Sequence, residues 1–110
     1  MSEVYFAGLR ADRQTENIPS KIHRLFEKAR LGSTFTKGDL VAVKTHLGEP
    51  GNTTFLRPQF VSAVVDMIRK DGGKPFLTDS NTLYLGGRSN AVDHLNAAVR
   101  HGFTYPVVDA

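Results

Sequence analysis

The amino-acid sequence predicts an α/β fold, three-layer and αβα-like, with a small, mostly parallel sheet whose strands are joined by crossover helices. Short β-prone runs alternate with helix-like segments along the 110 residues. The runs at 40–43 and 75–78 are too short for helices, and turn residues around Gly38 precede the first of them. An amphipathic segment separates these two runs, and a strand–helix–strand order makes consecutive strands parallel through a right-handed crossover.

Two further extended runs are expected near the ends of the chain, at residues 4–7 and 105–108. Three segments between the four runs have the apolar spacing of an amphipathic helix. Pro58 suits the first position of the second helix and Gly72 its end, while Ser89 or Asn90 can cap the third. The residues expected to be buried are Ile22, Leu25, Phe26 and Ala29; Phe60, Val61, Val64, Val65 and Ile68; and Val92, Leu95 and Val99.

The composition excludes several classes of protein. Hydrophobic residues make up 40% and charged residues 23% of the chain, as in ordinary globular domains. No apolar run is long enough to span a membrane and no secretory signal is visible, so we expect a cytoplasmic protein without a membrane partner. The net charge of +3 comes from cations spread along the chain, which argues against a nucleic-acid partner. Because the chain has no cysteine, it cannot by itself hold a disulfide or an iron–sulfur cluster.

The last extended run ends at Ala110 with no helix after it to cover the sheet. Three helices and four short strands make a thin core, since small domains bury a small share of their surface. Two interpretations are open: residues 1–110 are the N-terminal part of a longer protein, or they form a complete small domain that forms a homo-oligomer to protect its sheet edge. The size of the core favours the first, in which the C-terminal remainder of the protein is the partner of this domain.

Two polar loops follow the two central strands, at residues 44–57 and 79–90. Ligands of open parallel sheets bind outside the carboxyl ends of the strands, where such loops converge. We therefore expect the loops to emerge side by side, with His46, Arg57, Asp79 and Arg88 in a single cleft.

The catalytic candidates are His46, Glu49 and Asp79. Imidazole and carboxylate groups can work together as acid and base, and Asp79 ends a strand, where ligand-orienting carboxylates are common in this architecture. The plainer interpretation of the first two is a tight turn whose glycines serve backbone geometry. Two such residues do not make a metal site, so none is expected within the chain.

The ligand-binding candidates surround two expected helix N-termini, where free N–H groups favour an anion. Arg57 precedes the second helix, and capping by a threonine or by water is the commoner alternative there. His94, one turn into the third helix, reaches back toward the loop or lies in solvent. The glycines at 86–87 do not form a Walker motif. The full set is Asn52, Thr53, Arg57, Asn81, Arg88, Ser89 and His94.

Both loops carry a resemblance to a known family. The residues that carry it are His46-Leu47-Gly48-Glu49-Pro50-Gly51-Asn52-Thr53-Thr54, Arg57-Pro58, Asp79-Ser80-Asn81-Thr82-Leu83-Tyr84 and Arg88-Ser89-Asn90-Ala91-Val92-Asp93-His94-Leu95. Over roughly residues 40–103 the chain resembles the domain of unknown function (DUF362) family, whose members are often described as iron–sulfur cluster-binding proteins. Members continue with ferredoxin-type 4Fe-4S cysteine motifs, so the resemblance implies clusters in a missing C-terminal part and none in this chain. A fainter similarity to the N-terminal domain of nickel-pincer lactate racemases concerns the fold alone.

These observations lead to three hypotheses. In the first, residues 1–110 are the N-terminal α/β domain of a redox or electron-transfer iron–sulfur protein, with a small anionic-ligand site formed by the two loops. In the second, they form a cluster-independent enzyme or a nucleotide- or phosphate-binding domain that uses His46, Glu49 and Asp79. In the third, the loops pack against the rest of the protein as an assembly module. We favour the first.

Overall fold

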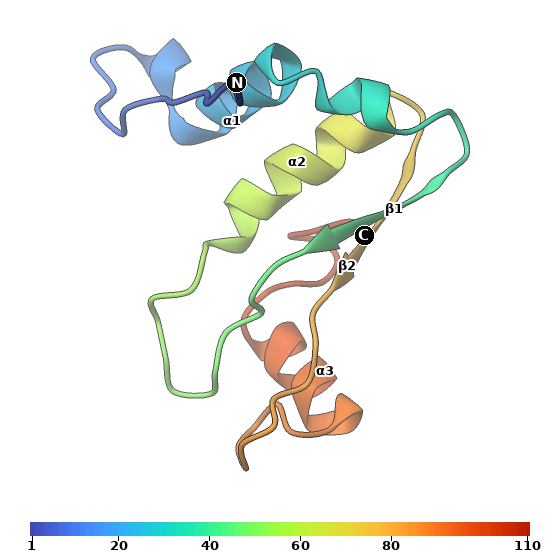
Figure 1. Ribbon diagram of the computed structural model, residues 1–110. Helices are drawn as coiled ribbons and strands as arrows, with labels where there is room; N and C mark the ends of the chain where they lie inside the picture. Colours follow the sequence, from blue (N-terminus) through green and yellow to red (C-terminus); the bar gives the residue numbers. More distant parts are fainter.

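The computed structural model describes all residues 1–110. Its elements are short 3₁₀ turns η1 (Gln14–Glu16) and η2 (Leu31–Thr34), helices α1 (Ile18–Lys28), α2 (Pro58–Lys70) and α3 (Ala91–Arg100), and strands β1 (Leu40–Lys44) and β2 (Lys74–Thr78). The two strands are parallel and α2 connects them (Figure 1). The predicted α/β class is confirmed.

The register of the sheet fixes which residues leave it together. Leu40 lies opposite Lys74 at one end, and Lys44 lies opposite Thr78 at the other. The backbone N–H of Thr45 also donates to the carbonyl of Thr78, at 3.1 Å. Both loops therefore start at the same end of the sheet, where the two strands have their carboxyl ends, and their first residues are one position apart in register.

Helices cover one face of the sheet. Val41 and Val43 of β1 pack with Phe26 of α1 and with Met67 and Ile68 of α2. These contacts confirm the general direction of the apolar faces that were predicted for the first two helices. Within residues 1–110 the opposite face stays open, since Leu40 is 77% and Phe76 41% exposed.

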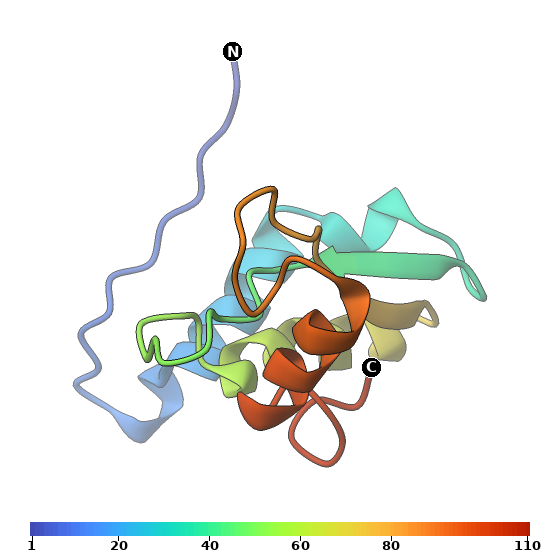
Figure 2. The same ribbon diagram turned by 90° about the horizontal axis from the view of Figure 1, so that it is seen from below.

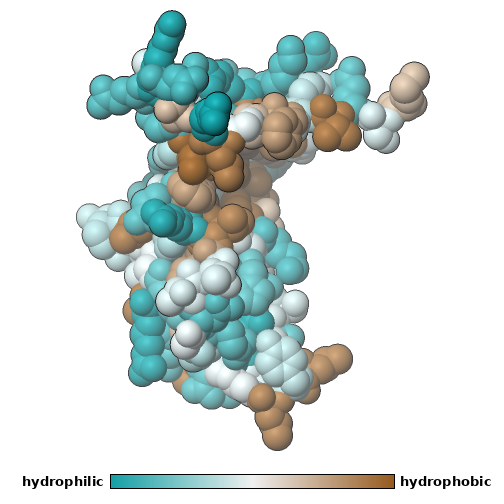
Figure 3. All heavy atoms as spheres, turned by 90° about the vertical axis from the view of Figure 1, so that its left-hand side faces the viewer, coloured by the Kyte–Doolittle hydropathy of each residue, from teal (hydrophilic) through white to brown (hydrophobic).

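Hydrophobic side chains are also exposed elsewhere on the molecule. Figure 3 shows them gathered below the N-terminal helices and again at the lower tip. The tip belongs to the 79–90 loop, where Leu83 and Leu85 are almost fully exposed.

Two predicted strands are wrong. Residues 4–7 are extended but pair with nothing, Val4 and Phe6 are each 88% exposed, and the arm runs away from the body of the molecule (Figure 2). Residues 105–108 form a turn in which the N–H groups of Val107 and Val108 donate to Thr104. β-Propensity describes side chains that suit a sheet, and it becomes a strand only where a neighbouring strand supplies partners.

The predicted buried face of α3 is also wrong. Val92, Leu95 and Val99 are more than half exposed, whereas the buried face carries His94, Ala97 and Ala98. Ala98 packs in a cluster with residues of the first loop, of α2 and of the chain after α3, namely Leu47, Val61 and Phe103. Small alanine side chains allow this close approach, which the apolar spacing of the larger residues does not reveal.

Candidate functional site

The two loops touch each other directly. Gly87 lies so close to Pro50 that a Cβ atom at Gly87 would be 2.4 Å from Pro50 Cγ. A glycine is therefore required where the second loop crosses the first. The expectation that the two loops emerge side by side from one edge of a parallel sheet is confirmed.

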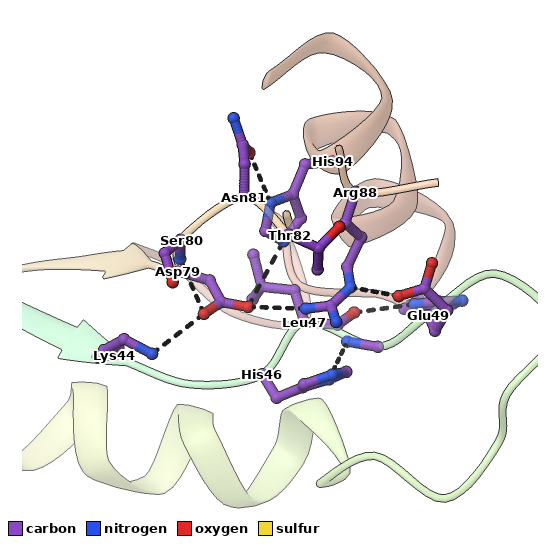
Figure 4. Close-up of polar contacts among 12 residues, drawn as sticks. Lys44, His46, Leu47, Glu49, Asp79, Ser80, Asn81, Thr82, Arg88 and His94 are labelled. Carbon is purple, nitrogen blue, oxygen red and sulfur yellow. Dashed lines mark hydrogen bonds and ion pairs between the residues drawn. The ribbon is translucent and has the colours of Figure 1, made fainter. Parts of the chain in front are cut away.

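Arg88 ties the loops together. Its side chain is buried, and its Nε donates to Glu49 Oε2 at 2.7 Å and its Nη1 to Asp79 Oδ2 at 3.1 Å (Figure 4). Its Nη2 donates to the Tyr84 hydroxyl at 3.0 Å. A buried guanidinium needs such acceptors because removing its charge from water is costly. We call Arg88, Glu49, Asp79 and Tyr84 the arginine network.

Glu49 is an acceptor within this network. Besides Arg88, the Tyr84 hydroxyl donates to its Oε2 at 2.9 Å. The hydrogen bonds from Arg88 and Tyr84 lower the pKa of Glu49 from its ordinary value. Glu49 is thus held as a carboxylate whose contacts join the first loop to the second.

Asp79 lies at the end of β2 with its side chain only 6% exposed. Burial raises the pKa of Asp79, but the N–H of Ser80 and the ammonium of Lys44 outweigh that effect and lower it. Lys44 Nζ lies 3.1 Å from Oδ1, as the strand register allows, and the Ser80 N–H lies 2.9 Å from the same oxygen. The buried carboxylate is therefore ionised and compensated.

His94 reaches back toward the second loop, which settles the alternative left open by the sequence. Its Nδ1 lies 3.0 Å from Asn81 Oδ1, and its Nε2 lies 3.5 Å from Asp79 Oδ2 (Figure 4). The imidazole lines a cavity of about 220 Å³, here called the histidine cavity. Its walls are Leu47, Leu77, Thr78, Asp79, Asn81, Ala91, His94 and Leu95.

A second cavity of about 460 Å³ lies at the N-terminus of α2, and we call it the cationic pocket. Arg57, Arg100 and His101 contribute its basic groups, and neither arginine takes part in an ion pair. No carboxylate lines it. The full lining is Gly51, Asn52, Thr53, Phe55, Arg57, Pro58, Arg100 and His101.

The N-terminus of α2 differs from those of the other two helices. Asn17 caps α1 and Asn90 caps α3 through side-chain oxygens, whereas no side chain caps α2. The predicted alternative of a threonine cap is not seen, because Thr54 instead donates from its N–H and its hydroxyl to Asn52 Oδ1. The N-terminus of α2 therefore has no side-chain cap, and Arg57 and Pro58 bring it to the cationic pocket. Pro58 has no N–H, and the Phe60 N–H donates to the carbonyl of Arg57 at 2.9 Å.

His101 is half-buried and forms part of the wall of this pocket. Its Nδ1 lies 2.8 Å from the carbonyl oxygen of Leu47, which can only accept, so Nδ1 carries a proton. Its ring stacks on Phe55 with centroids 4.5 Å apart. The sequence signal for its position is weak: it ends α3 just before Gly102, whose φ of 85° turns the chain.

The expected single cleft is wrong, because the candidates divide between the two cavities. Arg57 lines the cationic pocket with Asn52 and Thr53, while Asp79, Asn81 and His94 line the histidine cavity. Four other candidates lie outside both cavities: Glu49 and Arg88, which belong to the arginine network, and His46 and Ser89. The ring of the exposed His46 accepts from the Gly48 N–H at 3.0 Å, and the Ser89 hydroxyl donates to the carbonyl of Gly86 within its own turn.

With this geometry in place, comparison with known proteins gives a clear family. A family model described as Domain of unknown function (DUF362) matches residues 41–110. The chain belongs to this family. The resemblance carried by the two loops is therefore confirmed.

One curated relative of this DUF362 chain is a thylakoid-associated protein of Synechocystis sp. (strain ATCC 27184 / PCC 6803 / Kazusa), 38% identical over 53 residues. The match covers 46% of this chain and 16% of that protein, so the chain spans a small part of its relative. No solved structure is significantly similar to the chain.

The residues of this DUF362 chain do not fit an iron–sulfur cluster. The chain has no cysteine, and no three histidine, aspartate or glutamate side chains gather where they could hold a metal ion. Cluster ligands would have to come from other residues than these 110. No helix is both long enough and apolar enough to cross a membrane.

Proposed function

We propose that this chain is the N-terminal α/β domain of an iron–sulfur protein, and that it binds a small oxyanion, a phosphate or a carboxylate, in the cationic pocket. The observation that carries the anion site is the charge of its walls. Arg57, Arg100 and His101 converge there with no acidic side chain among them.

Physical chemistry supports an anion at this position. A guanidinium hydrogen-bonds phosphate or carboxylate through two parallel N–H groups, and such charge-assisted bonds are roughly twice as strong as neutral ones. The positive end of the α2 dipole acts in the same direction. Asn52 adds a neutral donor, because its Oδ1 is occupied by Thr54 while its amide N–H groups are free.

The anion site is tested by thermal shift with inorganic phosphate and with citrate, one probe for each oxyanion class. Both wild type and Arg24→Ala, which removes an exposed arginine from α1, should gain melting temperature with a bound probe. Arg57→Ala should lose most of that gain. An equal gain in Arg57→Ala and wild type would place the anion elsewhere, and no gain with either probe would refute the site.

The iron–sulfur part of the proposal rests on the family resemblance, with 4Fe-4S clusters held by a C-terminal part and an electron-transfer role for the whole protein. It is tested on the full-length gene product, purified without oxygen, by visible absorbance and electron paramagnetic resonance. Cluster signals that disappear when downstream cysteines are replaced are expected. A colourless full-length protein would refute this part and leave the anion site untouched.

We also propose the cytoplasmic location expected from the sequence. The alternative is association with membranes, which the relative named as a thylakoid-associated protein makes concrete. Cell fractionation followed by immunodetection separates the two outcomes. Recovery in the soluble fraction is expected, and recovery with membranes would contradict the assignment.

A second candidate function, a cluster-independent enzyme, is favoured by one observation. Asp79 and His94 lie together in the wall of the histidine cavity at the carboxyl edge of the sheet. The acid–base pair would then be Asp79 with His94, whereas His46 and Glu49 make other contacts. Removal of His94 is the test, and an activity that survives His94→Gln would exclude this pair.

A further inference from the structure

The two ring nitrogens of His94 have different surroundings. Nε2 is buried without a hydrogen-bond partner, and the nearest acidic oxygen, Asp79 Oδ2, lies 3.5 Å away. Nδ1 faces Asn81 Oδ1 at 3.0 Å. Asn81 itself is exposed and lines the same cavity.

The space between Nε2 and Asp79 can hold only a proton. Nε2 is inaccessible to water, and a separation of 3.5 Å leaves no room for another heavy atom between the two. If Nε2 carried a lone pair, it would face a carboxylate oxygen, and both atoms would be acceptors. A proton on Nε2 replaces that repulsion with electrostatic attraction to the carboxylate of Asp79.

Charged groups around His94 keep Asp79 available as the acceptor. From β1, Lys44 contacts the far oxygen of Asp79, and from the second loop Arg88 contacts the near one. Arg88 is shared with Glu49 of the first loop. On α3 itself, the Asp93 carboxylate accepts from Asn90 Nδ2 at 2.7 Å. Asp79 is therefore the only carboxylate that faces the imidazole, and it is ionised.

We propose that Asp79 and His94 form a proton-transfer dyad in the histidine cavity. Asp79 is the positioning residue: it holds a proton on Nε2, so that Nδ1 is the nitrogen that takes up and releases protons. Asn81 suits both states of Nδ1, since its oxygen accepts from Nδ1–H and its amide nitrogen donates to the bare nitrogen after a half-turn.

The cavity indicates the class of molecule that would exchange a proton with Nδ1. Its walls are half apolar, with Leu47, Leu77 and Leu95, and its one carboxylate is that of Asp79. These walls suit a small neutral molecule with a hydroxyl group better than an anion. In the forward step the hydroxyl proton moves to Nδ1 and the oxygen keeps the electron pair. The imidazolium that results faces Asp79, and the reverse step returns the proton.

The dyad is separate from the cationic pocket, so it does not depend on the proposed anion site. ¹⁵N NMR of histidine-labelled protein tests it, because ring-nitrogen shifts identify which nitrogen is protonated. His94→Gln assigns the signals. On the alkaline side of the titration His94 is expected as the Nε2–H form, and lowering the pH should change its Nδ1 signal far more than its Nε2 signal.

His101 is an internal control in the same spectrum. It should show the opposite Nδ1–H form, because its Nδ1 faces a carbonyl oxygen. Asn81→Ala should leave the Nε2–H form of His94 intact if Asp79 sets it, and Asp79→Ala should convert His94 to a mixture of forms. If Asp79→Ala does not fold, the spectra of the wild type and of Asn81→Ala still test the proposal. A bare Nε2 in the wild type would overturn the proposal, as would a form that changes in Asn81→Ala.

Discussion

Two arginines at the same end of the molecule have opposite surroundings. Arg88 is buried and uses its guanidinium on Glu49, Asp79 and Tyr84. Arg57 is exposed, makes no ion pair, and lines a pocket without a carboxylate. Both precede a helix in a polar, glycine-containing loop, so their sequence contexts are alike. The sequence around each arginine therefore does not decide its role. An arginine with several hydrogen-bond acceptors within reach stabilises the fold, whereas one without them is free to bind a ligand.

The largest effect should follow from removing the buried arginine. Arg88→Ala leaves Asp79 and Glu49 without their shared partner, and breaking a buried ion pair from one side costs about 3 kcal/mol of unfolding free energy. Urea unfolding monitored by circular dichroism measures it. Arg88→Lys should recover part of the loss, since a single ammonium cannot reproduce the three-way contact. An Arg88→Ala protein as stable as wild type would show that the arginine network does not hold the loops together.

A matched pair of glycines in the first loop tests the close approach of that loop to His101. Gly48 and Gly51 both have positive φ, 87° and 86°, so alanine strains the backbone by about 1 kcal/mol at either position. A Cβ at Gly48 would also lie 2.4 Å from His101 Nδ1, whereas nothing lies within 4 Å at Gly51. Gly48→Ala should therefore cost about 2 kcal/mol or more, and Gly51→Ala about half of that.

Thermal unfolding compares the two glycine variants directly. Gly48→Ala should also displace His101 and weaken anion binding. In Gly51→Ala the affinity for the anion should stay closer to that of wild type. Equal losses in stability for the two variants would mean that the contact between Gly48 and His101 contributes nothing.

Acid should weaken the arginine network. The ordinary pKa values of Asp79 and Glu49 are 3.8 and 4.5, and both are lowered in the folded protein. Groups with a lowered folded pKa stabilise the fold above their unfolded pKa, and that contribution is lost as the pH falls through the folded value. The free energy of unfolding should thus decline as the pH falls below 4.5. Urea midpoints across this range measure the decline. It should be shallower in Glu49→Gln than in wild type, and an identical decline in the two proteins would contradict the account.

The smallest change in stability belongs to the free arginines. Arg57→Ala and Arg100→Ala should each shift the unfolding free energy by less than about 0.5 kcal/mol, because neither side chain has a partner to lose. The urea midpoint of each variant checks this. A loss comparable to that of Arg88→Ala would erase the contrast between the two regions.

Sequence patterns predicted the parts of the fold that depend on local chemistry. The parallel strand pair, the Pro58 start of α2, its Gly72 end and the Asn90 cap follow from turn, cap and crossover rules. The joining of the two loops was also predictable, since parallel strands end at the same edge.

Long-range partners decided the rest. Residues 4–7 have the composition of a strand but no neighbour with which to pair. α3 buries Ala98 because Phe103, from the chain after it, packs there and leaves room only for a small side chain. His94 is buried against Asn81 and Asp79 of the second loop. Arg88 is withdrawn from ligand binding because it pairs with Glu49, 39 positions away along the chain. No local pattern reports such a pairing.

Calorimetric titration of inorganic phosphate into wild type, Arg57→Ala and Arg88→Lys tests the contrast between the two arginines most directly. Arg57→Ala should weaken binding about tenfold, as expected for the loss of one charge-assisted contact. Arg88→Lys, although less stable, should bind phosphate as wild type does. Unchanged affinity in Arg57→Ala together with lost affinity in Arg88→Lys would contradict the assignment and place the anion on the arginine network.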